Sequence, residues 1–140
     1  CTASELIIHR PPMLLIDSLT ERHGDRAAAS ATISSDNLCC SGEGNILPEY
    51  FIEIMAQTMA AANGYDNLKN GTPPKDGFIV GMDRFALHKF PAVGDTLTIR
   101  IKKNMEFGSM KVMEGKVYAG DDLLSSVELK VWEQDADEKE

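Results

Sequence analysis

The sequence predicts an α+β fold in which one long helix lies beside an antiparallel β-sheet of about six strands. Three observations support this prediction. Only one long stretch, residues 48–64, lacks both strand-like alternation and an internal helix breaker. Two short strand-like stretches precede it and four longer ones follow it. Helix and strands are therefore segregated along the chain rather than alternating, which favours an antiparallel sheet.

The stretch from Pro48 to Gly64 (PEYFIEIMAQTMAAANG) has helix signals at both ends. Pro48 suits a first helical position, where its missing N–H would be unpaired in any case, and Asn45 is a plausible N-cap. Asn63-Gly64 is a common way for a helix to end. Apolar residues and alanines cover most of the circumference, so we expect the helix to be buried on several sides with the sheet curving around it.

The polar residues of this helix fall on one narrow stripe. Glu49, Glu53 and Gln57 follow one another at i, i+4 and i+8. A carboxylate on a mostly buried helix costs free energy unless it is paired, neutralised or used in chemistry. The spacing alone allows two interpretations, a solvated helix face or a functional carboxylate.

The strands are expected in six stretches. Met13–Ile16 is a short continuous apolar run, which predicts a strand buried on both faces, and residues 27–33 predict a second after a turn at residues 21–25. The last four strands are expected at residues 77–87, 96–105, 110–119 and 123–134. Gly81 lies inside the first of these four, and a strand glycine often marks the close approach of a ligand or another backbone.

Length and composition limit the possible classes of protein. The 140 residues suggest one domain over 1–134 and a charged tail over 135–140. No apolar run approaches the ~20 residues of a membrane span, and no signal-peptide pattern opens the chain. The cysteines and histidines lack the spacing of a disulfide framework or a metal site, so a reducing, cytoplasmic setting without a metal is expected. A net charge of −8 argues against a nucleic-acid binder.

The charge is unevenly spread along the chain. Residues 84–111 contain six basic and two acidic residues, although the whole chain is acidic. This segment is interpreted either as a patch that receives an acidic partner or a phosphate, or as ordinary solvated strand faces. The candidates for such a patch are Arg84, Lys89, Lys102 and Lys103.

Several stretches resemble a known family when they are taken in order. Residues His9–Asp17 (HRPPMLLID) closely resemble the N-terminal signature of the 3-hydroxyacyl-acyl carrier protein dehydratases. Glu53–Gln57 (EIMAQ) is similar to their central-helix motif, and Phe78–Asp83 (FIVGMD) and Val93–Leu97 (VGDTL) look like their next two segments. The likeness runs from about Leu6 to Gln134.

The resemblance implies the hotdog fold, in which an antiparallel sheet wraps a long helix and two subunits pair edge to edge. The Leu47-Pro48 entry to the helix and the sequence Met55–Thr58 look most like the dehydratase-like branch from aryl polyene gene clusters. In the family each active site lies at the dimer interface, in a tunnel for a phosphopantetheine-linked acyl chain. The implied partners are an acyl carrier protein or CoA thioester and a second hotdog subunit, and no cofactor is implied.

The resemblance also implies roles for single residues. Glu53 matches the carboxylate that handles the C3 hydroxyl, and Gln57 matches the family glutamine. Gln57 is interpreted as structural support whose amide bonds to nearby backbone, with a plain polar-stripe residue as the alternative. The residues expected to shape the acyl site by backbone approach or position are Ser41, Gly44, Asn45 and Gly81.

The family histidine, which takes the C2 proton, has no match in this chain. If Gly44-Asn45 is aligned with the family's Gly-Asn, Ser41 stands at the histidine position. A slightly different alignment places Cys39 or Cys40 there. Neutral serine cannot replace an imidazole as a base near pH 7, whereas a thiolate could. His88 is a further candidate, because it could lie near a carrier-binding surface.

Three functions remain open at this point. The first is a 3-hydroxyacyl thioester dehydratase that uses Glu53 with a substitute base or with a base from a partner. The second is a non-catalytic hotdog subunit that pairs with an active dehydratase. The third is an acyl thioesterase in which Glu53 acts as base or nucleophile.

Overall fold

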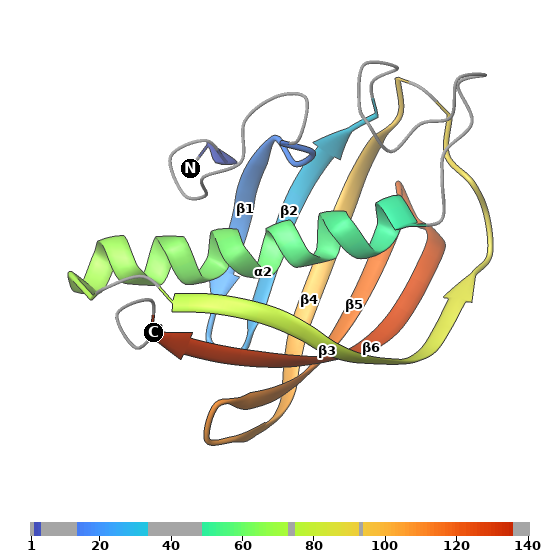
Figure 1. The fold of residues 1–140 in the computed structure, drawn as a ribbon. Coiled ribbons are helices and arrows are strands. Elements are labelled where there is room, and N and C mark those ends of the chain that lie inside the picture. Colours follow the sequence, from blue (N-terminus) through green and yellow to red (C-terminus); the bar gives the residue numbers. More distant parts are fainter. Residues whose placement is uncertain (1, 4–13, 34–48, 73–74, 93, 136–140) are drawn as a thin grey trace.

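The structure is a computed structural model that describes residues 2–3, 14–33, 49–72, 75–92 and 94–135. Six strands form one antiparallel sheet in the order β1-β2-β4-β5-β6-β3, and one long helix lies against it (Figure 1). The elements are β1 (Ser18–His23), β2 (Arg26–Thr32), α2 (Glu49–Asn70), β3 (Lys75–Leu87), β4 (Thr96–Phe107), β5 (Met110–Ala119) and β6 (Asp122–Asp135). The α+β class with about six antiparallel strands is thus confirmed.

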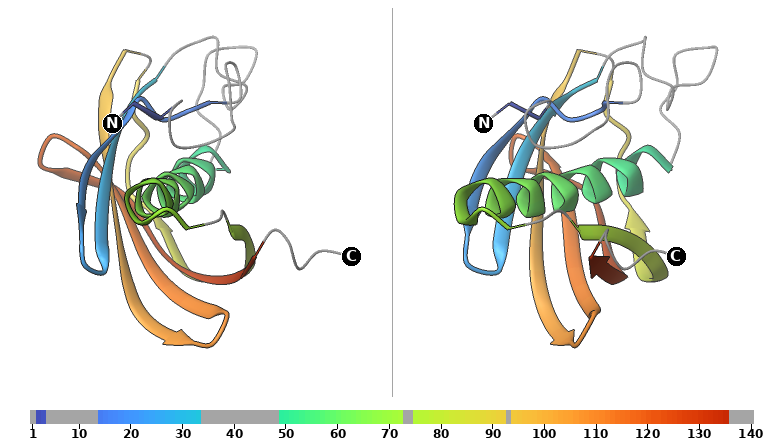
Figure 2. Two further views of the ribbon diagram at one scale, coloured as in Figure 1. Left: turned by 90° about the vertical axis from the view of Figure 1, so that its left-hand side faces the viewer. Right: turned by 60° about the vertical axis from the view of Figure 1, so that its left-hand side comes forward.

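The sheet curves around α2, as the views in Figure 2 show. The helix buries Phe51, Ile54 and Met55 completely against the concave face. The strand residues that meet it alternate with outward-facing residues and are fully or almost fully buried, among them Leu97, Ile99, Val117, Val127 and Leu129. Burial of this shared apolar surface is the main force that holds helix and sheet together.

Gly115 allows the helix to approach β5 closely. A Cβ atom at this position would lie 2.5 Å from Met55 Sδ and 3.2 Å from Met55 Cγ. Met55 is completely buried, so its side chain has little room to move aside. The absence of a side chain at Gly115 therefore sets the spacing between α2 and the centre of the sheet.

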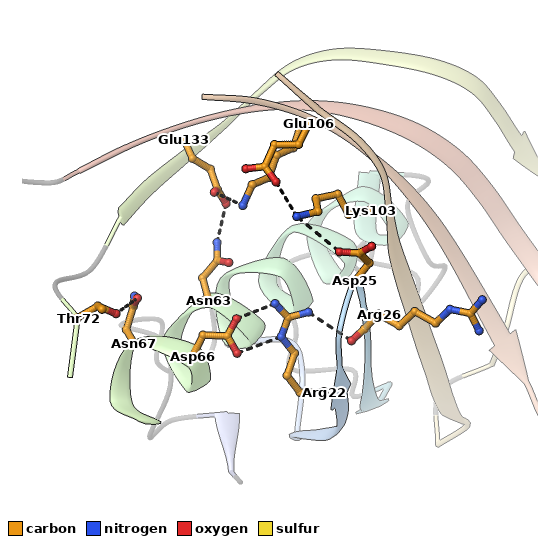
Figure 3. Close-up of polar contacts among 11 residues, drawn as sticks. Arg22, Asp25, Arg26, Asn63, Asp66, Asn67, Thr72, Lys103, Glu106 and Glu133 are labelled. Atoms are coloured by element: carbon orange, nitrogen blue, oxygen red, sulfur yellow. Dashed lines mark hydrogen bonds and ion pairs between the residues drawn. The ribbon is translucent and has the colours of Figure 1, made fainter. Parts of the chain in front are cut away.

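The predicted end of the helix at Asn63-Gly64 is wrong, because α2 continues to Asn70. The Asn63 side chain does not cap the helix but donates to Glu133 Oε2 at 2.6 Å. The helix ends instead at Gly71, which has φ of +66°, and the Thr72 N–H bonds to the Asn67 carbonyl at 3.0 Å. This backbone bond, with a left-handed glycine after the last helical residue, is a Schellman-type helix ending. Figure 3 shows that the Thr72 hydroxyl also donates to the Asn67 side chain.

The strand predicted at Met13–Ile16 is also wrong, because residues 14–17 form no strand and β1 begins at Ser18. Met13 itself lies outside the described residues. Leu15 and Ile16 are buried as expected for core residues. The Leu15 N–H, however, bonds to a helix side chain rather than to a neighbouring strand.

The remaining strands lie close to their predicted positions, and β5 matches residue for residue. Of the tail predicted from residue 135, Asp135 belongs to β6 and the rest lies outside the described residues. The edge strand β3 is interrupted by two register shifts, between Ile79 and Gly81 and between Asp83 and Ala86. In the part of the chain that the structure describes, no helix is long and apolar enough to cross a membrane.

The substitution Gly115→Ala should destabilise the fold. The new Cβ would overlap the Met55 side chain in a packed core, and such overpacking costs about 1–3 kcal/mol in the free energy of unfolding. The matched control is Gly77→Ala on β3, where the nearest side-chain atom would lie 3.8 Å from the Cβ. Urea unfolding should leave this control within about 0.5 kcal/mol of wild type. Equal stability of both variants would contradict the proposed spacing role of Gly115.

Candidate functional site

Gln57 links the helix to the segment that precedes β1. It is 1% exposed, although it belongs to the polar stripe. Its Oε1 accepts the Leu15 N–H at 2.8 Å, and its Nε2 donates to Glu53 Oε1 at 3.0 Å. The backbone N–H can only donate, so it must face the Gln57 oxygen, and the amide must present its N–H to Glu53. The orientation of the Gln57 amide is therefore fixed by the backbone.

This arrangement holds the Glu53 carboxylate at a defined place on the helix. Glu53 is half-buried, whereas Glu49, one turn earlier, is exposed. The polar stripe is therefore not uniformly solvated, because it runs from the exposed Glu49 through the half-buried Glu53 to the buried Gln57. Gln57 provides the structural support that its position one turn from Glu53 predicts. A partly accessible carboxylate with a buried, pre-oriented partner can take part in proton transfer to a bound molecule.

Two of the sequence stretches that resemble the dehydratases meet at this point. Leu15 belongs to the first stretch, and Glu53 and Gln57 belong to the central-helix stretch. The first stretch is also tied to β2, because the Asp17 N–H donates to the Ser30 carbonyl at 2.7 Å. The carboxylate is therefore positioned by both the helix and the sheet.

The other residues predicted for the site are less closely connected to Glu53. Gly81 lies in β3 at the first register shift, and a Cβ there would come within 3.2 Å of Lys130 Cδ on β6. The close approach predicted for this glycine is thus made by a neighbouring side chain. His88 is exposed, and its backbone N–H donates to the Leu124 carbonyl at 2.7 Å. Five further residues predicted for the site lie outside the described part of the chain, namely Ser41, Gly44, Asn45, Cys39 and Cys40.

Two residues of the predicted basic patch lie on strands that are not neighbours, because Lys103 is on β4, Arg84 is on β3, and β5 and β6 lie between these strands in the sheet. Lys103 contacts Glu106 at 2.6 Å and Asp25 at 3.5 Å. The hydrogen bond to Glu106 raises the pKa of the Lys103 ammonium above its ordinary value, more than partial burial lowers it. Arg84, by contrast, is highly exposed and lies 3.9 Å from Glu128.

Arg84 also has an unusual backbone conformation, which sequence reasoning missed. Its φ is 55°, in the left-handed region, and it lies at the second register shift of β3. This conformation costs an arginine free energy that a glycine would not lose. Strained residues of this kind are concentrated at functional sites. The sequence gives no local signal for it, because an arginine disfavours the left-handed region and glycine is the residue that usually marks it.

Replacement of Gln57 should weaken the fold more than replacement of Glu53. In Gln57→Leu the buried Leu15 N–H loses its acceptor, which costs about 1–3 kcal/mol in the free energy of unfolding. Glu53→Gln keeps an oxygen that can accept from Gln57 and should change stability by less than about 0.5 kcal/mol. Chemical denaturation of the two variants measures both values. A Gln57→Leu protein as stable as wild type would refute the linking role of Gln57.

The chain is similar to proteins of known class over nearly its whole length. A family model described as ApeP-like, ApeP dehydratase, matches residues 1–140. The 3-hydroxyacyl-[acyl-carrier-protein] dehydratase FabZ of Natranaerobius thermophilus is 32% identical over 133 residues, which cover 89% of each chain. FabZ of Clostridioides difficile is 28% identical over 133 residues with the same coverage.

Solved structures agree with this fold. A chain of the dehydratase heterocomplex ApeI:P from Xenorhabdus doucetiae superposes with a TM-score of 0.87 at 17% identity, covering 99% of this chain and 94% of the other. A hypothetical thioesterase with coenzyme A from Streptococcus pneumoniae superposes with a TM-score of 0.65 at 13% identity, covering 84% and 85%. These likenesses show the hotdog fold. Given the family match over residues 1–140 and the FabZ relatives, the chain belongs to the ApeP-like family of hotdog dehydratases.

Proposed function

We propose that this protein is a subunit of a 3-hydroxyacyl thioester dehydratase and that Glu53 acts on the C3 hydroxyl of the substrate. The observation that supports this role is the linkage from the Leu15 backbone through Gln57 to the Glu53 carboxylate. The FabZ relatives are named as dehydratases of 3-hydroxyacyl chains on an acyl carrier protein. An acyl thioester of a carrier protein is accordingly the proposed substrate.

The reaction removes a proton from C2 and the hydroxyl group from C3. It therefore needs a base near C2 and an acid near the C3 hydroxyl. A protonated Glu53 would give its proton to the leaving hydroxyl, which departs as water. The Gln57 N–H holds one carboxyl oxygen in place, so the group need not be ordered when the substrate arrives. The base is proposed to come from a second hotdog subunit, because no histidine of this chain matches the family base.

The edge strand β3 is the proposed pairing surface for that second subunit. It has 13 residues and forms one edge of the sheet in the single chain. An edge strand with exposed apolar side chains calls for a covering partner. Those side chains are Phe78, Ile79, Val80, Met82 and Phe85. A partner of this type is consistent with the superposed ApeI:P structure, which is named a heterocomplex.

The decisive experiment is a turnover assay with a 3-hydroxyacyl-carrier substrate, in which the enoyl product is detected by mass. The protein is assayed alone and with a hotdog subunit that co-purifies from the native source. Glu53→Gln should reduce turnover about 10²-fold or more, because it removes the acid without removing the hydrogen bond from Gln57. The control Glu49→Gln changes an exposed carboxylate one turn away and should leave turnover unchanged.

Three outcomes of this assay distinguish the open functions. Enoyl product that depends on Glu53 supports the proposed dehydratase. Unchanged turnover of the intact complex with Glu53→Gln assigns the chemistry to the partner and this chain to a non-catalytic role. Free thiol and acid in place of enoyl product would indicate a thioesterase.

Arg84 is proposed to contact the acidic carrier protein, which would explain why a strained, exposed cation is present on β3. Arg84→Gly should remove the strain and stabilise the protein by up to about 1 kcal/mol, while it raises KM for the carrier-linked substrate. Arg100→Ala is the control, because Arg100 is an exposed arginine already paired with Glu21 at 3.3 Å. Thermal unfolding and steady-state kinetics measure the two effects. An unchanged KM would contradict the carrier contact.

A further inference from the structure

A cavity lies beneath the C-terminal half of α2, on a different side of the helix from Glu53. Ala62 lines it and comes about two and a half turns after Glu53, on the opposite helix face. The turn between β1 and β2 closes one wall with Gly24 and Asp25. The volume of the cavity is about 50 Å³, and the cavity is partly open to solvent.

The cavity has an apolar floor and a charged rim. On each of three strands, an apolar residue of the floor is followed or preceded, two positions away, by a charged residue of the rim. Along the concave face, Ile101 is followed by Lys103 on β4, and Val131 is followed by Glu133 on β6. On β5, Lys111 stands before Met113 at the same end of the sheet. The floor residues are almost completely buried. Ionic side chains thus occupy positions where the alternation of the strands calls for apolar ones.

The charges of the rim are arranged in opposite pairs. Lys111 Nζ lies 2.5 Å from Glu133 Oε1, and Glu133 Oε2 also accepts from Asn63 at 2.6 Å. Arg22 makes two hydrogen bonds to Asp66, at 3.1 and 2.6 Å. Figure 3 shows Arg22 and Asn63 in these contacts, with Lys103 beside Asp25. The cations of the described rim are therefore compensated, and the wall offers donors and acceptors without an excess of either charge.

Stability alone does not explain this rim. Glu133 is only 8% exposed, and a buried ion pair is seldom more stabilising than apolar residues of similar volume. Ionic residues at these positions keep the cavity open and polar at one end. A compensated polar wall suits an uncharged hydroxyl or amide better than a free anion, which would compete with the carboxylates already present.

We infer that this cavity is a binding site for a small amphiphilic molecule with an uncharged hydroxyl or amide end. The polar end meets Lys111, Glu133 and Asn63, and the apolar body lies over Met113 and Val131. Small apolar pockets with a few convergent polar groups are the usual form of such sites. This site is independent of the chemistry proposed for Glu53.

The test uses 1-hexanol as the probe and the methionine methyl groups as reporters. Met59 and Met113 line the cavity, whereas Met82 and Met105 are exposed on the strands elsewhere and serve as internal controls. With ¹³C-methyl methionine, the cavity methyl signals should shift and saturate with a Kd on the order of millimolar, as expected for so small a ligand. The control methyl signals should not shift.

Two comparisons make the result specific to the cavity and to its polar end. Hexanoate should bind at least about tenfold more weakly than 1-hexanol, because the rim cations already have carboxylate partners and its own carboxylate would lose water without gaining an unpaired cation. Ala62→Leu fills the cavity and should abolish the hexanol shifts, whereas Glu53→Gln should retain them. The inference is overturned if wild type shows no saturable shift, if Ala62→Leu binds equally well, or if hexanoate binds as tightly as hexanol.

Discussion

The burial of α2 inside the curved sheet is the constraint on which the rest of the structure depends. A helix enclosed on several sides cannot leave the polar side chains of its enclosed faces to solvent, so these side chains must find partners within the protein. Gln57 meets this requirement through Leu15 and Glu53, and Asn63 meets it through Glu133. Thr58, which is completely buried, donates back to the Ile54 carbonyl at 2.7 Å. The polar contacts on either side of the helix are thus consequences of its burial.

The same constraint explains how the two sides of the helix differ. On the side of Glu53, one carboxylate is positioned by a neutral amide and remains half-buried. On the side of Asn63, the carboxylate of Glu133 is almost completely buried and has a lysine beside it. Glu53 is the more accessible of the two carboxylates, whereas Glu133 is engaged by both Lys111 and Asn63. The proposed chemistry is therefore assigned to Glu53 and the proposed ligand binding to the cavity.

Most of the fold could be predicted from the sequence, because local pattern and tertiary structure agree there. Turns at Gly108-Ser109 and Gly120-Asp121 bound β5 on both sides, so its limits are those expected. Predictions failed where a distant contact decided the local structure. Asn63-Gly64 has the local chemistry of a helix end, but the contact with Glu133 favours continued helix. Leu15 belongs to a strand-like apolar run, yet its N–H is taken by Gln57, 42 residues away. The functional residues were predicted in the same uneven way. Glu53 and Gln57 share a helix face that their spacing reveals, whereas the rim of the cavity joins residues of three strands whose spacing in the sequence is unrelated.

The two register shifts in β3 have a further consequence for the cell that makes this protein. A strand that adds to this edge cannot form one continuous ladder, because the register of β3 is regular from Lys75 to Ile79 but shifts between Ile79 and Gly81 and again between Asp83 and Ala86. An unrelated extended segment, such as part of a chain still emerging from the ribosome, would have to break its own hydrogen bonding twice to pair there. A subunit with matching irregularities would not. The edge can thus remain apolar without becoming a template for aggregation. Its irregular register makes it selective for a strand with matching irregularities.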